Sequence, residues 1–363
     1  MNLLISAYAC EPNKGSEPEV GWRWVVDLSK KYERVTVVTR KNNRPSIEDG
    51  LKSVSLPNVQ FLYFDLSFLF LKFKKVPVIG TYLYAYLWEM MLPFFICKHF
   101  KFKSFDFSQR VTFVSYKFPS MLWLFSKKFI LGPIAGGERY PIKLITLFSL
   151  KGKISEVIRF LLQRAVFLDP FILLTLWKAD EIIAVTSETR SILPQMYRSK
   201  VQIEPAISVQ VEDFKNVTEP ATIENGFKFL FVGRLLEWKG LGLLIKALGA
   251  YRSEDYVLDV VGEGDATFFK KIASKAGANV RFHGAVERSE LSRYYISANL
   301  FVFPSLHDSG GMVVLEAKEF GLPVIVTSYG GPKYFVGDLD HIVSGKTEVE
   351  LIANLREKID LYL

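Results

Sequence analysis

Short apolar runs alternate with helical patterns along almost the whole chain, and this alternation limits the fold more than any other feature of the sequence. Runs that are apolar on both faces are typical of parallel strands covered by helices. Strands and helices in alternation predict a doubly wound α/β fold. We expect strands at residues 3–9, 34–40, 59–64, 110–115, 128–134, 181–187, 228–234, 257–264, 280–284, 300–305 and 323–328.

A polar stretch at residues 212–226, EDFKNVTEPATIENG, separates the two halves of the chain. The length of 363 residues also favours two domains, at about 100–200 residues each. We therefore predict two Rossmann-like doubly wound domains, over residues 1–211 and 227–363, that face a cleft. Ligands of such sheets bind beyond the carboxyl ends of the strands.

Composition narrows the functional classes. The formal net charge of +8 favours anionic partners, such as nucleic acid, anionic lipid or phosphorylated small molecules. With only Cys10 and Cys97, the chain has no disulfide framework and no cysteine-rich zinc site, which fits a cytoplasmic compartment. The four histidines show no metal-ligand spacing, so no metal site is expected. Residues 1–10 lack the basic start of a signal peptide and read as a strand.

Two apolar segments raise the question of a membrane. Residues 78–97 are long enough to span a bilayer, but Glu89 and Pro93 argue against a span and favour a buried or membrane-surface helix. Residues 61–105 interleave aromatic groups with lysines, which suits peripheral contact with anionic lipid at the inner face of the cytoplasmic membrane; internal packing is the alternative. Residues 154–168 form an amphipathic pattern whose apolar face we expect to cover a core.

The segment HDSGGMVVLEAKEFGLPVI, residues 307–325, carries the first chemical pattern. A loop holding Asp308 follows a predicted strand, and a helix that begins near Gly311 holds Glu316. Free amides at a helix start attract anions, so we expect a phosphate near Gly310 and Gly311. The two acids can hold different parts of one elongated ligand. The alternative is a capping Asp308 and a solvated Glu316.

Two other stretches repeat the arrangement of strand, glycine-bearing loop and helix. In FVGRLLEWKGLGLLIKAL, residues 231–248, Arg234 follows a strand and Lys239 precedes a helix. An arginine fork and a lysine point charge together suit a diphosphate, whereas two ordinary surface cations are the alternative. In ACEPNKGSEPEVGW, residues 9–22, Gly15 and Ser16 lie in the loop.

Together these stretches resemble the retaining glycosyltransferases of family 4, which have the GT-B fold. The family's pair of acids appears as Asp308 and Glu316, although the first is more often Glu. Its phosphate-binding pair matches Arg234 and Lys239, and its G-x-G turn matches GEG at 262–264. Its F-x-G-x-V strand end matches FHGAV at 282–286.

VTFVSYKFPS (111–120) and GPIAGGE (132–138) are similar to a bacterial surface-polysaccharide branch of that family. That branch usually has His where this chain has Gln109 and Arg110. The family also usually continues beyond LREKIDLYL into a segment that packs on the first domain.

The resemblance implies an enzyme that moves a hexosyl-type sugar, with retention and without metal or cofactor, from a UDP- or GDP-sugar to a glycan or lipid-linked acceptor. Residues 1–211 would then be the acceptor side and 227–363 the donor side, and no nucleic acid would be bound. Glu316 would bind ribose hydroxyls and Asp308 sugar hydroxyls; His307 is a further candidate contact. The catalytic candidates are Arg234, Lys239, Asp308 and Glu316. The donor-binding candidates are Gly15, Ser16, Gly233, Gly262, Gly264, Val286, Ser309, Gly310, Gly311 and Met312.

Other functions fit parts of the pattern. A nucleotide-sugar epimerase or hydrolase could use the same fold. A dinucleotide oxidoreductase would need a third glycine in VGEGDATFF. A basic membrane-surface binding protein is the non-enzymatic alternative.

Overall fold

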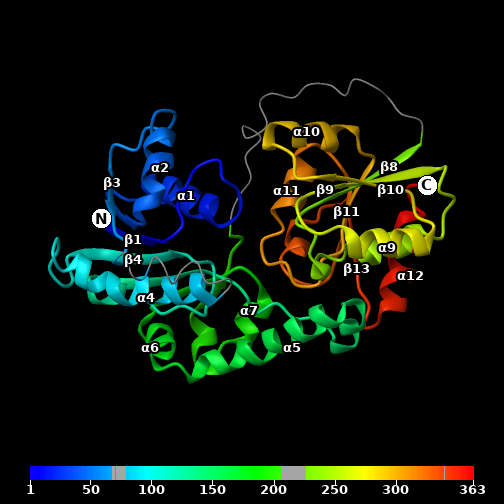
Figure 1. Ribbon diagram of the computed structural model, residues 1–363. Coiled ribbons are helices and arrows are strands. Elements are labelled where there is room, and N and C mark those ends of the chain that lie inside the picture. Colours follow the sequence, from blue (N-terminus) through cyan, green and yellow to red (C-terminus); the bar gives the residue numbers. More distant parts are fainter. Residues whose placement is uncertain (68–69, 71–78, 207–225, 339) are drawn as a thin grey trace. The chain divides into compact units, whose positions relative to one another are not determined.

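The computed structural model describes residues 1–67, 70, 79–206, 226–338 and 340–363 (Figure 1). It forms two compact α/β units, each built on one fully parallel sheet, so the predicted fold class is confirmed. The first unit comprises Met1–Gly137 and Leu161–Ile207. The second comprises Glu138–Phe160 and Ser208–Leu363.

The first sheet has seven strands in the order β3-β2-β1-β4-β5-β6-β7. Leu3 and Ile5 point to one face of it and Leu4 to the other, as the two-residue period of a strand requires. Both faces are thus apolar, which explains the unbroken runs in the sequence. The strands are β1 (Asn2–Ala7), β2 (Arg34–Thr39), β3 (Val59–Tyr63), β4 (Phe105–Thr112), β5 (Ser126–Ile134), β6 (Glu181–Ala184) and β7 (Val201–Ile203).

Helices cover the two faces of this sheet. Trp22 and Val25 of α1 pack on the face that holds Leu3, and Trp88 of α4 packs on the face that holds Leu4. The helices are α1 (Ser16–Ser29), α2 (Arg44–Gly50), α4 (Ile79–Ile96), α6 (Pro170–Lys178) and α7 (Ser187–Ile192). Helix α5 (Leu150–Ala165) begins in the second unit and ends in the first.

Strand β4 begins five residues before the predicted start at residue 110. The prediction missed this start because polar residues interrupt the apolar run in its sequence, FDFSQRVT. Most of the strand's buried polar groups have partners within the protein, the exception being Arg110 Nε. Gln109 Nε2 donates to the Gly132 carbonyl at 2.8 Å, and Arg110 donates to the carbonyl oxygens of Phe113 and Ser115. The two residues that replace the usual histidine therefore belong to the interior of the sheet.

The second sheet has six strands in the order β10-β9-β8-β11-β12-β13. The strands are β8 (Phe227–Val232), β9 (Tyr256–Val261), β10 (Val280–Gly284), β11 (Leu300–Phe303), β12 (Val324–Thr327) and β13 (His341–Val343). The helices are α8 (Leu241–Leu248), α9 (Thr267–Ala276), α10 (Arg288–Ser297), α11 (Met312–Glu319) and α12 (Glu348–Ile359). The edge strands β7 and β13 are too short to stand out as apolar runs.

The compact units differ from the predicted domain limits in one respect. Residues 138–160 belong to the second unit, because Tyr140, Leu144 and Phe148 pack into its core. The predicted linker at 212–226 lies, apart from Gly226, outside the described residues.

Helix α4 holds the apolar segment that raised the question of a membrane span. Tyr84, Trp88 and Leu92 are buried, whereas Tyr82 and Phe94 are exposed. Ser6 Oγ donates to Oε1 of the buried Glu89 at 2.7 Å, and burial raises the pKa of Glu89 to about 7. Among the helices that the structure describes, none is long and apolar enough to cross a bilayer.

Candidate functional site

Glycines bring the carboxyl ends of β8 and β9 into contact. Gly233 has φ 152° and Gly262 has φ 148°, a conformation open chiefly to glycine. The Gly233 amide donates to the Val261 carbonyl at 2.9 Å. A Cβ on Gly262 would lie 2.0 Å from the Gly233 oxygen, so no larger residue fits there. A Cβ on Gly264 would likewise lie 2.8 Å from the Cβ of Leu235.

The turn after β8 is bonded to the loop after β11. The amide of Leu306 donates to the Trp238 carbonyl at 2.9 Å, and a Cβ on Gly240 would lie 2.0 Å from the Pro304 oxygen. This contact places Lys239 beside Asp308, where Nζ donates to Oδ2 at 2.6 Å. Two candidates from sequence positions 69 residues apart thus form one ion pair.

Asp308 also binds the amides at which we expected a phosphate. Its Oδ1 accepts from the amides of Gly310 and Gly311, each at 3.1 Å. Desolvation would raise the pKa of Asp308, but Lys239 and these amides outweigh it and hold that pKa below its usual range. Asp308 is therefore ionised and binds amides of the loop before α11, a helix that has no side-chain cap, and a phosphate would reach these two amides only by displacing it.

Glu316 lies on α11 and is almost fully buried, so the alternative of a solvated side chain is wrong. The hydroxyl of Tyr295, on α10, donates to Glu316 Oε2 at 2.9 Å.

Arg234, unlike Glu316, is not buried. It is exposed and makes no ion pair with any residue that the structure describes.

The remaining donor-side candidates lie at the same carboxyl edge. Gly310 has open space where a Cβ would stand, which leaves its backbone approachable. Gly311 has φ 58° and precedes α11. Ser309, Met312 and Val286 are half-buried.

Sequence reasoning missed a cluster around Glu156. Its carboxylate accepts from the Tyr140 hydroxyl at 2.8 Å, from Arg159 Nε at 2.9 Å and from His307 Nε2 at 3.2 Å. The His307 ring stacks between Trp238 and Tyr140, with ring centroids 4.3 and 6.0 Å away. His307 therefore contacts a helix from the first half of the sequence, and its expected contact with the donor stays a prediction.

Charge states follow from these contacts. Burial alone would raise the pKa of Glu156, but His307, Arg159 and Tyr140 together lower it to about 2. Burial lowers the pKa of His307 below its usual range. At neutral pH we assign an ionised Glu156 that accepts the Nε2 proton of a neutral His307. The cluster fixes the residue next to Asp308.

Gly15 lies in the first unit, in the loop between β1 and α1, and Ser16 is the first residue of α1. Asn13, Gly15 and Ser16 all have positive φ, at 58°, 63° and 52°. Two non-glycine residues in this region within four positions indicate stored backbone strain, which concentrates at functional loops. Sequence reasoning found the glycine but not the strain.

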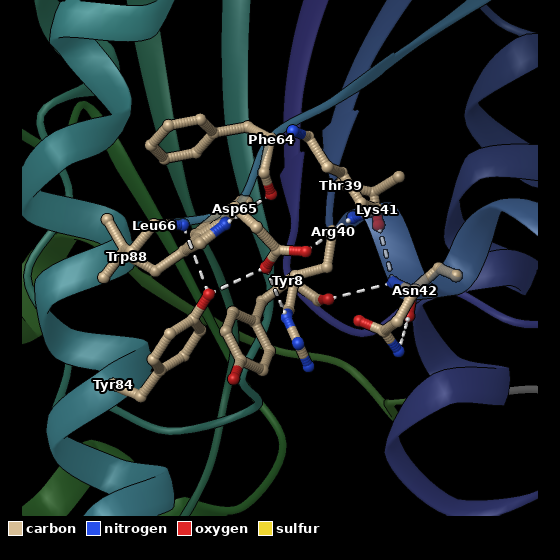
Figure 2. A network of polar contacts seen from close by, with 11 residues as sticks. Tyr8, Thr39, Arg40, Lys41, Asn42, Phe64, Asp65, Leu66, Tyr84 and Trp88 are labelled. Carbon is tan, nitrogen blue, oxygen red and sulfur yellow. Dashed lines mark hydrogen bonds and ion pairs between the residues drawn. The ribbon is translucent and has the colours of Figure 1, made fainter. Parts of the chain in front are cut away.

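Figure 2 shows a second polar network of the first unit, at the ends of β1, β2 and β3. Asp65 Oδ1 accepts from Arg40 Nε at 2.9 Å and from the Tyr84 hydroxyl at 2.8 Å. The Arg40 guanidinium lies 5.0 Å from the ring centroid of Tyr8 and 5.3 Å from that of Tyr84. Trp88 Nε1 donates to the Phe64 carbonyl at 2.9 Å. The network ties α4 to the carboxyl edge of the sheet.

Within the described residues, no three histidine, cysteine, aspartate or glutamate side chains are grouped so that they could hold a metal ion.

Residues 213–361 match the family model "Glycosyl transferases group 1". A D-inositol 3-phosphate glycosyltransferase of Arthrobacter sp. (strain FB24) is 37% identical over 114 residues, which are 29% of this chain and 27% of the relative. The lipopolysaccharide glucosyltransferase WaaG of Escherichia coli (strain K12) is 30% identical over 135 residues, which are 35% of this chain and 36% of WaaG. The matches thus span about a third of these relatives.

Solved structures share the fold over nearly the whole chain. A crystal structure of WaaG covers 99% of this chain and 90% of its own, with a TM-score of 0.60 at 16% identity. Sucrose-phosphate synthase from Thermosynechococcus elongatus covers the same shares, with a TM-score of 0.62 at 15% identity. The chain therefore has the GT-B fold, and its residues 213–361 are similar to the glycosyl transferases group 1 family.

Proposed function

We propose that this chain is a retaining, metal-independent glycosyltransferase that moves a hexosyl group from a UDP- or GDP-sugar to a glycan or lipid-linked acceptor in surface-polysaccharide synthesis. One observation carries the proposal. The Lys239–Asp308 ion pair lies beside glycine-lined turns at the carboxyl edge of the domain that matches the family model.

Transfer breaks the bond between the sugar and a diphosphate, so negative charge grows on the leaving group. Lys239 has three donors and gives one to Asp308, which leaves two for phosphate oxygens. The exposed Arg234 adds a planar fork that suits a second phosphate. Lys239, held by its ion pair before the reaction, and Arg234 would stabilise the developing charge.

The sugar becomes cation-like as the bond breaks. The ionised Asp308 would meet it through sugar hydroxyls, and Glu316 would accept from the ribose. With retention, the acceptor attacks on the face that the diphosphate leaves. The family match and the name of WaaG support the substrate class.

The donor site is tested by nucleotide binding. We expect UDP or GDP in EDTA to raise the melting temperature, because a ligand at a hundred times its Kd stabilises by about 2.7 kcal/mol. Scanning fluorimetry at millimolar nucleotide measures the shift, with AMP as the control. If no nucleoside diphosphate changes the melting temperature, the proposal of a donor site is wrong. If the shift appears only with Mg²⁺, the proposal of metal independence is wrong.

Glu316→Gln separates ribose binding from chemistry. The amide keeps the shape but loses the charge, and hydrogen bonds to charged groups contribute about 1.5–3 kcal/mol. We expect UDP to bind about tenfold to a hundredfold more weakly by titration calorimetry, with the transfer rate at saturation changed much less. Unchanged affinity would exclude the ribose role.

Transfer itself is measured with a panel of UDP- and GDP-sugars. Sugar release or isomerisation without any acceptor would instead identify a hydrolase or an epimerase.

A lipid-linked acceptor would require contact with a membrane surface. Tyr82, Leu83 and Phe94 on α4 are exposed, and the nearby Lys98 and Lys101 are exposed as well. They support peripheral contact through the first unit. Lys72, Lys74 and Lys75, which also belong to the predicted patch, lie outside the described residues.

A further inference from the structure

Helix α5 is amphipathic, but it is turned the opposite way from our expectation. We expected the apolar face to cover a core. In the structure that face points to solvent: Leu150 is 77% exposed, Ile154 55% and Leu161 67%. The exposed apolar residues of the helix are Leu150, Ile154, Val157, Ile158, Leu161 and Leu162. Spacing of three and four residues puts most of them on one stripe.

The polar face of α5 points inward and explains the reversal. Glu156 binds Tyr140, Arg159 and His307, and Gln163 Nε2 donates to the Gly136 carbonyl at 3.0 Å. Glu156 and Gln163 are both buried. The helix is thus held by hydrogen bonds whose donors and acceptors fix its orientation, and its apolar stripe cannot turn inward without breaking them.

An exposed apolar stripe of this size is rare on a protein that meets only water, and it indicates a partner or a membrane. Just beyond the helix, Leu168 is 85% exposed and extends the apolar surface.

The basic side chains beside the apolar stripe indicate what kind of partner binds it. Lys151 borders one edge of it, and Lys153 and Arg164 border the other. The one acid on the helix, Glu156, faces inward. In a symmetric dimer both copies use the same patch, so the cations at its edges would meet apolar or basic side chains and no exposed acid of the partner helix. An anionic lipid surface complements them, with apolar side chains among the acyl chains and cations among the headgroups.

We propose that the outward face of α5 is a membrane-binding surface for anionic lipid. This surface is separate from the one on α4. The proposal rests on the proposed function in one respect: a lipid-linked acceptor would require the enzyme to bind a membrane. The test needs neither donor nor acceptor, so its result and that of the transfer assay are independent.

Co-sedimentation with vesicles tests the apolar stripe. We expect the full chain to sediment with vesicles of phosphatidylglycerol and phosphatidylcholine, to bind pure phosphatidylcholine weakly, and to be released by salt. Leu161→Asp should lower the partition coefficient about tenfold or more, because a leucine side chain leaves the interface. Val349→Asp, at a site 77% exposed on α12, is the matched control and should bind like the wild type.

Charge reversal tests the basic edges. Lys151→Glu, Lys153→Glu and Arg164→Glu together should lower binding about a hundredfold or more, since each cation near the surface contributes about fivefold. The same reversal at Lys270, Lys271 and Lys275, exposed on α9, changes net charge equally and should have a much smaller effect. Melting temperatures verify that each variant is folded.

Three results would overturn the proposal. The wild type could stay in the supernatant with both kinds of vesicle. The control variants could lose binding as much as the α5 variants do. Gel filtration could show a dimer that Leu161→Asp dissociates, which would make the face an interface between copies.

Discussion

Replacing Lys239 by alanine is expected to lower the rate of sugar transfer by two to three orders of magnitude. The ammonium would meet charge that develops on the leaving diphosphate, and removing such a group costs about 3–4 kcal/mol of transition-state stabilisation. The change also leaves Asp308 without its cation. Arg234→Ala should fall in the same range without disturbing any ion pair of the described residues. The measurement is kcat and kcat/KM at saturating acceptor.

Lys246→Ala provides the matched control for Lys239. Lys246 lies on α8, the helix that Lys239 precedes, and pairs with Glu348 on α12 rather than with a site candidate. Its transfer rate should stay near that of the wild type. A folded Lys239→Ala or Arg234→Ala variant with wild-type kcat/KM would exclude that residue from the chemistry.

The second large effect is expected at Glu156. Glu156→Gln keeps the shape of the side chain but leaves Arg159 without its carboxylate and weakens the bond to His307. Losing one partner of a buried charge pair lowers the free energy of unfolding by about 3–5 kcal/mol. The second unit should therefore unfold at a clearly lower urea concentration. Hydrogen exchange of the second unit's amides, read by mass spectrometry, follows this unit separately from the first unit, which holds five of the six tryptophans. Glu357→Gln, at an exposed site on α12, should unfold like the wild type.

The pH dependence of this loss has a defined sign. The folded-state pKa of Glu156, about 2, lies below the ordinary value of 4.5, so the folded protein binds fewer protons in that window. The contribution is complete above pH 4.5 and is lost as the pH falls towards 2. The pKa of His307 is also lowered, so its contribution declines as the pH falls below 6.5. The difference between wild type and Glu156→Gln should therefore shrink on acidification from pH 5 to pH 3. A constant difference would mean that Glu156 is not ionised in the folded protein.

The sequence predicted the sheets well because their strands are buried on both faces and therefore apolar throughout. It misplaced the start of β4, where Asp106, Ser108 and Gln109 interrupt the apolar run. Those polar groups are tolerated because partners on other segments, such as the Gly132 carbonyl, satisfy them. A linear pattern does not contain such partners.

The same limit applies to the candidate site. Lys239 and Asp308 were predictable because each follows a strand, and parallel strands end at one edge of their sheet. A helix-capping Asp308 was open as an alternative, but its bonds to Gly310 and Gly311 lie before the helix, and their competition with phosphate was not foreseen. Glu156 and His307 are 151 positions apart, so nothing local linked them.

The orientation of α5 was wrong for a related reason. Periodicity shows that a helix has two unlike faces, and an apolar face usually turns inward. Here Glu156 and Gln163 bind buried partners and reverse that rule. Which face is buried depends on the hydrogen-bond partners and apolar surfaces that other segments place beside the helix. The helical pattern alone does not indicate those partners.

The second unit is assembled from two separate stretches of chain, residues 138–160 and 208–363. During synthesis at about 5–20 residues per second, Glu156 is made roughly 8–30 seconds before His307. Through that interval α5 has its outward apolar stripe but lacks part of what orients its polar face. The nascent chain is therefore most exposed to aggregation, and to premature capture by a membrane, in the middle of its own translation. A fragment that begins at residue 208 would lack Tyr140, Glu156 and Arg159 altogether.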